Sequence, residues 1–203
     1  MSSQLKVNSI KDTSNNEAIT ISSGNVSFNN TISAGAIGSS VTGFTGPKVA
    51  DTWRLNTVFQ GLANPITNLT RATSSNDGQI GSAMTVSSGV FTFPMTGIYQ
   101  IIFKAMLKIQ EANLNLTYAG TSINKVISGT TTVIDQCYSM RAATSSSATF
   151  YMHNISSVIF DCTNTSTDKV SFSTNDLSST AVSTIHSTTQ NLTCMLFTRL
   201  GDT

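Results

Sequence analysis

The chain has 203 residues, of which 39% are hydrophobic and only 10% are charged, and its formal net charge is +1. The hydrophobic share is too high for a disordered chain, and the abundant Thr, Val, Ile and Phe favour strands, so we predict an all-β protein. The basic residues are spread singly, which leaves no cluster to follow a phosphate backbone, and we expect no nucleic acid partner.

Two features of the sequence indicate the compartment in which the protein is made. The first residues contain no apolar segment typical of a secretory signal, and no apolar run approaches the roughly 18 residues that span a bilayer. We therefore expect synthesis in a cytosol and no membrane insertion. The three cysteines, Cys137, Cys162 and Cys194, are odd in number and widely spaced, which favours buried free thiols over a disulfide framework.

Residues 1–46 are expected to form a separate N-terminal segment that ends at Gly46-Pro47. Their short apolar runs alternate with polar residues, as in small strands, but are too thin to bury a core alone. The segment is therefore either a loose arm or a docking segment ordered against another chain, and the regular alternation favours docking. The side chains expected to make this contact are Leu5, Val7, Ile10, Ile19, Ile21, Val26 and Phe28.

Residues 47–203 are expected to form a head domain, and its first runs are short. Residues 52–59 alternate, which predicts one strand with Trp53, Leu55, Thr57 and Phe59 on the same face. A weaker strand is expected over residues 66–72, and another run, at residues 83–86, precedes the most apolar stretch of the chain.

That stretch, residues 88–107, consists of a short aromatic run, a break from Pro94 to Gly97, and a long second run. One face of the long run is wholly apolar: Tyr99, Ile101, Phe103, Ala105, Leu107 and Ile109. The other face mixes apolar and polar side chains: Ile98, Gln100, Ile102, Lys104, Met106 and Lys108. Such a strand is covered on both sides. The core covers the first face, and for the second we favour a partner subunit over a ligand groove.

Further apolar runs complete the head. They predict strands at residues 114–118, 123–127, 131–141, 148–155, 158–162, 170–174 and 192–200, the last of them central. Residues 175–190 are rich in Ser and Thr and predict either a surface loop or a weak edge strand near residues 181–182. Such a loop could recognise glycans or be inert surface. About ten short strands separated by turns predict a β-sandwich or jelly roll, preceded by the small extended β segment.

From about residue 51 to residue 203 the chain resembles the tumour necrosis factor and complement-head superfamily of trimeric ten-stranded jelly rolls. The resemblance rests on residues 88–94 (SGVFTFP) followed by Gly97-Ile98-Tyr99, on residues 168–172 (DKVSF) and on the closing run. It implies a homotrimer, with candidate interface residues Trp53, Ile98, Ile102, Met106, Phe172 and Phe197. The animal members' receptor functions do not carry over, because the sequence has neither a collagen-like stalk nor an acidic calcium cluster.

The N-terminal runs at residues 5–10, 18–21 and 26–28 resemble the opening of tail-fibre and virion surface proteins of marine and cyanobacterial phages. This resemblance implies a bacteriophage virion protein, made in the host cytoplasm, whose N-terminal segment binds other virion proteins. The head would then bind a host-surface glycan or protein. The alternative is a capsid decoration protein that stabilises the shell without recognising a host.

The sequence shows no arrangement of residues that indicates catalysis. His153 and His186 lack metal-ligand spacing, the acidic residues are scattered, and no glycine-rich phosphate loop opens a helix. We expect no metal, no cofactor and no enzymatic activity. A small β-sandwich hydrolase is kept as a third possibility, because two carboxylates distant in sequence can meet in the fold.

Overall fold

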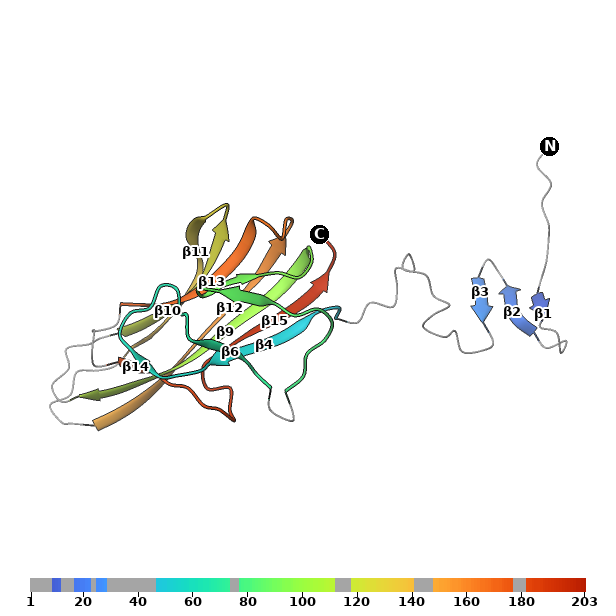
Figure 1. Cartoon of the computed structure of the whole chain (residues 1–203). Coiled ribbons are helices and arrows are strands. Elements are labelled where there is room, and N and C mark those ends of the chain that lie inside the picture. The colour runs from blue at the N-terminus through green and yellow to red at the C-terminus, as the bar shows by residue number, and fades with distance from the viewer. Residues whose placement is uncertain are drawn as a thin grey trace. The chain divides into compact units, whose positions relative to one another are not determined.

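The computed structural model describes residues 9–11, 17–22, 25–28, 47–73, 77–111, 118–140, 148–176 and 182–203. Within these ranges every regular element is a strand (Figure 1), which confirms the all-β prediction. The chain divides into two compact units, Met1–Thr45 and Gly46–Thr203.

The N-terminal unit contains an antiparallel sheet of three strands, β1 (Ser9–Lys11), β2 (Glu17–Ser22) and β3 (Asn25–Phe28), in the order β1-β2-β3. Ile19 is paired with Ile10 on one side and with Phe28 on the other, and Ile21 is paired with Val26. Five of the predicted docking residues therefore lie in this sheet. Leu5 and Val7 lie outside the described residues.

The Gly46–Thr203 unit, called the head below, is built from two antiparallel sheets. The first sheet has the order β5-β14-β9-β15-β4-β6, with β12 paired to the free side of β9. Its strands are β4 (Ala50–Leu55), β5 (Phe59–Gln60), β6 (Leu69–Arg71), β9 (Gly97–Glu111), β12 (Ala148–Cys162), β14 (Val182–Thr184) and β15 (Cys194–Gly201).

The second sheet has the order β11-β10-β13-β8-β7. Its strands are β7 (Thr85–Ser87), β8 (Val90–Thr92), β10 (Tyr118–Ile127), β11 (Thr130–Met140) and β13 (Asp168–Asn175). The chain changes sheet between β6 and β7, β8 and β9, β9 and β10, β11 and β12, β12 and β13, and β13 and β14. These crossings between two facing sheets make the head a jelly roll, as the sequence predicts.

The core lies between the two sheets and is centred on Phe91 of β8. Its ring contacts Trp53, Phe172 and Phe197, with centroid separations of 5.4, 5.6 and 5.0 Å. These three residues are at most 8% exposed in the single chain, so the expectation that they line a trimer interface is wrong. Phe197 is paired with Ile101, whose side chain is also fully buried, and this register turns Phe197 inward.

Strand β9 confirms the prediction for its two faces. The six apolar side chains of the first face, Tyr99 to Ile109, are fully buried in the core. The alternating residues Ile98, Ile102 and Met106 are half-buried on the outer face of the first sheet.

Other predicted strands differ from the observed ones. The first ends at Leu55 instead of Phe59, because the chain turns at Asn56, whose N–H donates to the Asn68 carbonyl at 2.8 Å; Thr57 is therefore exposed. Residues 148–162 form one strand rather than two, since Ser156 and Ser157 continue the pairing with β9. Val182 begins a short strand between β5 and β9, not an edge strand.

The cysteines are free thiols, and only Cys162 is buried; Cys137 and Cys194 are half-buried.

Candidate functional site

The outer face of the first sheet carries large apolar side chains on β12. Along this strand every second residue from Thr149 to Asp161 points to solvent. Among them Tyr151, Ile155 and Ile159 are 55%, 58% and 59% exposed. A strand that buries one face in the core and exposes isoleucines on the other leaves apolar surface available to a partner.

The apolar surface continues across β9 and β15, because residues paired in register point to the same side of a sheet. Ser157 of β12 is paired with Ile102 of β9, and Ile102 is paired with Leu196 of β15. His153 is likewise paired with Met106. We name the apolar members of this surface the outer apolar face: Ile98, Ile102, Met106, Tyr151, Ile155, Ile159 and Leu196.

The few charges on this face lie singly among the apolar groups. Lys104 and Lys108 of β9 are half-buried and are paired with Ile155 and Tyr151 of β12. Cys194, paired with Lys104 on β15, lies on the same face. Burial raises the pKa of the Cys194 thiol, although the charges of Lys104 and Arg54 act in the opposite direction. Its thiol is therefore protonated at neutral pH and acts as a small apolar group.

Three of the six predicted interface residues, Ile98, Ile102 and Met106, come together on this face. The β12 residues were missed because the sequence around Ser156-Ser157 suggests a break between two strands. The period-two spacing of Tyr151, Ile155 and Ile159 was the signal that could have found them, had the run been treated as one strand.

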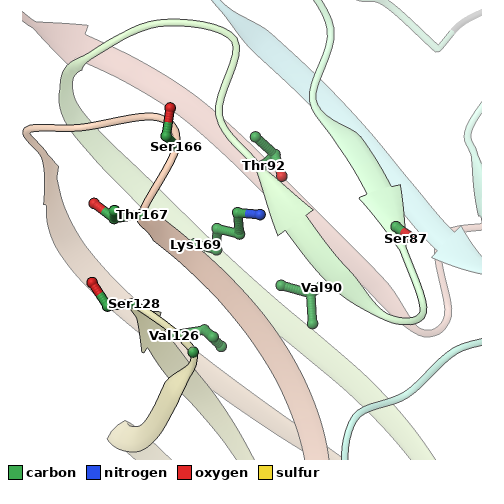
Figure 2. A pocket seen from close by; sticks show the side chains of 9 residues that line it. Ser87, Val90, Thr92, Val126, Ser128, Ser166, Thr167 and Lys169 are labelled. Carbon is green, nitrogen blue, oxygen red and sulfur yellow. The ribbon is translucent and has the colours of Figure 1, made fainter.

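A hollow of about 430 Å³ lies on the second sheet. Figure 2 shows Lys169 of β13 extending across it toward β8, with hydroxyl side chains around the rim. Its lining residues are Ser87, Val90, Thr92, Val126, Ser128, Gly129, Ser166, Thr167 and Lys169. We call this feature the hydroxyl-lined hollow.

The hollow is held in shape by the turns that border it. The Ser128 N–H donates to the Thr167 carbonyl at 3.2 Å, which joins the β10–β11 turn to the turn before β13. Lys169 is paired with Val126 on one side and with Thr92 on the other. Of the residues that line the hollow, Lys169 is the only charged one, so the site offers one positive charge and several hydroxyl groups.

Within the described ranges, no three His, Cys, Asp or Glu side chains are grouped so that they could hold a metal ion. His153 is exposed on the outer side of β12, and His186 lies half-buried after β14. The described part of the chain contains no helix that is long and apolar enough to cross a membrane.

Comparison with known proteins gives matches in structure but not in sequence. No protein-family model and no curated protein matches the chain. The crystal structure of murine APRIL at pH 5.0 is similar with a TM-score of 0.52 and 12% identity, over 75% of this chain and 98% of that chain. The structure of Eiger TNF from S. frugiperda is similar with a TM-score of 0.59 and 11% identity, over 78% and 96%. These likenesses establish the fold as a jelly-roll β-sandwich of the tumour necrosis factor type.

Proposed function

We propose that the chain is a homotrimeric virion surface protein of a bacteriophage, in which the head forms the trimer and binds the host surface. The outer apolar face is the main observation that supports a trimer. Ile155 and Ile159 are more than half exposed there, beside half-buried Ile102 of β9. Burying this surface against copies of the chain is favourable by roughly 25 cal/mol for each Å² of apolar area. The tumour necrosis factor type of fold supports the same arrangement.

The trimer is tested by charging the centre of this face. We expect the wild-type protein to have the mass of a trimer in light scattering coupled to gel filtration. Ile102→Lys and Ile155→Lys should give monomers that keep the β-sheet circular dichroism spectrum, because neither side chain belongs to the core. Thr131→Lys, on exposed β11 of the other sheet, is the matched control and should remain trimeric. A monomeric wild type, or a trimeric Ile102→Lys, would refute the proposed interface.

The place in the virion rests on the N-terminal unit, whose strands carry five of the predicted docking residues. We place this unit against other virion proteins and the head outward. Gold labelling of the C-terminus in images of the particle should mark the tail. Labels at the lattice points of the shell would support the capsid decoration alternative, and an unlabelled particle would exclude both.

The hydroxyl-lined hollow is our candidate for host recognition. Its hydroxyl groups can exchange hydrogen bonds with a sugar, and the Lys169 amine can pair with the carboxylate of an acidic sugar. Lys169→Ala should lower adsorption of labelled protein to host cells while the trimer persists. Lys48→Ala, at an exposed lysine outside the hollow, serves as the control. If both variants adsorbed as well as the wild type, the hydroxyl-lined hollow would not take part in host binding.

A further inference from the structure

A shallow, open hollow of about 350 Å³ lies where β10, β11 and β13 meet, and four side chains line it: Tyr118, Tyr138, Met140 and Asp176. We call this site the aromatic corner. The two tyrosine rings are 5.8 Å apart between centroids and their planes make an angle of 80°. The rings therefore make an edge-to-face contact, and each tyrosine is 43% exposed. Met140, which is 80% exposed, is paired with Tyr118.

The sequence builds this corner through a glycine. Gly120 of β10 is paired with Tyr138 of β11 and, on its other side, with Asn175 of β13. A Cβ atom at position 120 would lie 2.5 Å from Cε1 of Tyr138 and 3.1 Å from the Asn175 carbonyl oxygen. The Tyr138 ring thus packs directly over Gly120, and any larger residue there would displace the ring.

The charge of the corner is negative. Asp176 follows β13 in the left-handed region, at φ 51°, which aspartate tolerates better than most residues. Its carboxylate accepts a hydrogen bond of 3.2 Å from the Tyr138 hydroxyl. Burial, followed by this carboxylate, raises the pKa of Tyr138, so the hydroxyl remains a donor at neutral pH. None of the four lining residues carries a positive charge.

We propose that the aromatic corner binds a quaternary ammonium group, such as the trimethylammonium group of choline. Aromatic faces attract a cation within about 6 Å through the ring quadrupole, and methylated ammonium ions in particular. The ring faces and the Met140 thioether fit the methyl groups, and Asp176 supplies the opposite charge. A neutral sugar would use the ring faces but not the negative charge of Asp176, which favours a cation. This site lies apart from the outer apolar face and from the hydroxyl-lined hollow, and it goes beyond the function proposed above.

The test is a titration of the full-length protein with choline chloride, followed by NMR of protein carrying ¹³C-methyl methionine. Sodium chloride at equal concentration corrects for ionic strength. We expect a saturable shift of the Met140 methyl signal, assigned with Met140→Leu. The neutral isostere 3,3-dimethyl-1-butanol has the same shape without the charge and should bind at least tenfold more weakly. Glycine betaine, which carries a carboxylate close to its ammonium group, should also bind more weakly, because Asp176 repels it.

Choline binding by variants shows how much each residue of the aromatic corner contributes. Tyr138→Ala should abolish the shift, and Asp176→Asn should weaken binding about fivefold, as expected for one charge at about 4 Å in water. Gly120→Ala should weaken binding by displacing the Tyr138 ring, although it replaces none of the lining residues. Val133→Ala, an exposed apolar residue on the same strand, is the control and should bind as the wild type does. The proposal fails if choline produces no saturable shift, if the neutral isostere binds equally well, or if Asp176→Asn and Gly120→Ala both bind like the wild type.

Discussion

The Asp168 carboxylate organises the turn between β12 and β13. One carboxylate oxygen accepts hydrogen bonds of 2.9 Å from the Thr163 and Asn164 N–H groups and from the Thr163 hydroxyl. The other accepts a bond of 3.0 Å from the Thr167 hydroxyl. Burial alone would raise the pKa of Asp168, but these donors outweigh it and hold the pKa below its ordinary value. The turn that borders the hydroxyl-lined hollow therefore depends on an ionised group.

We expect Asp168→Ala to lower the free energy of unfolding by roughly 1–3 kcal/mol at pH 7, because four donors lose their acceptor. The folded pKa lies below the unfolded value of about 3.9, so the contribution is present above that pH and is lost as pH falls through the folded pKa. Urea unfolding gives the free energy of unfolding of the wild type and of Asp168→Ala at pH 7 and below about pH 3. The difference between the two free energies should be smaller in acid. Asp161→Ala, at an exposed position of β12, is the control, and a pH-independent difference would contradict the assignment.

Strand β9 begins at a position that requires glycine. Gly97 has φ 143°, and a Cβ there would lie 2.4 Å from Nε of Arg199 and 2.5 Å from the Gly201 carbonyl oxygen. The Arg199 side chain crosses this point to donate from Nε to the Thr96 carbonyl at 2.9 Å. The start of β9 is thereby tied to the end of β15, and the pairing of the two central strands depends on it.

We expect Gly97→Ala to destabilise the head by about 1–3 kcal/mol, the cost of holding an alanine in this backbone region, and by more if Arg199 is displaced. Thermal unfolding followed by circular dichroism would measure the effect. Gly201→Ala is a matched control on β15, because no atom lies within 4 Å of the Cβ it would add. If both variants melted at the same temperature, the close contact at Gly97 would not limit stability.

Substitutions on the two faces of β9 should have different effects. Phe103 is fully buried and its ring lies 5.0 Å from that of Phe172 in the opposite sheet. Phe103→Ala should therefore cost roughly 3–5 kcal/mol, measured by denaturant unfolding. Its neighbour in sequence, Ile102, points outward, so Ile102→Lys should change the oligomeric state far more than the stability of the head. A harmless Phe103→Ala would mean that the faces are assigned wrongly.

How far the sequence predicts these elements depends on their pattern. The inner face of β9 is wholly apolar and its outer face is mixed, so alternation alone identifies the core side. Strand β15 has Met195 and Phe197 buried and Leu196 facing outward, so both of its faces are apolar in sequence. Its orientation is set by its pairing with β9, which local sequence does not reveal, and Phe197 was therefore placed on the wrong side.

At the scale of the whole molecule, the head contains a complete core. The buried apolar residues that form this core extend from Val49 to Phe197, all within the Gly46–Thr203 unit. We expect residues 47–203, expressed alone, to fold and to melt within a few degrees of the full chain, as circular dichroism would show. A truncated protein that fails to fold would show that the N-terminal unit contributes to the head's stability.

The outer apolar face likewise depends on strand pairing that local sequence does not reveal. It contains residues of β9, β12 and β15. The register that pairs Gly97 with Cys162 also places Ile155 and Ile159 of β12 beside β9, although the two strands are far apart in the chain. The jelly roll could be predicted from strand number and the residues around Gly97, whereas Ile155 and Ile159 become part of a surface only through this register. The aromatic corner was also missed, since Tyr118, Tyr138 and Asp176 lie on three strands or their ends.

The pairing of β4 with β15 determines how the head responds to mechanical force. Ala50, the first residue of β4, lies opposite Thr198, near the end of β15, so both ends of the head emerge at the same end of one antiparallel pair. Hydrogen bonds in such a pair run perpendicular to the strands. Tension applied between residues 47 and 203 would break them one after another, as a zipper opens, and should open the head at low force. Tension between residue 47 and a ligand held at the far end of the strands would pull along β4 and load its bonds together. A head that binds its target at that far end, where Tyr118 and Met140 of the aromatic corner lie, would resist detachment better than one pulled through its two ends.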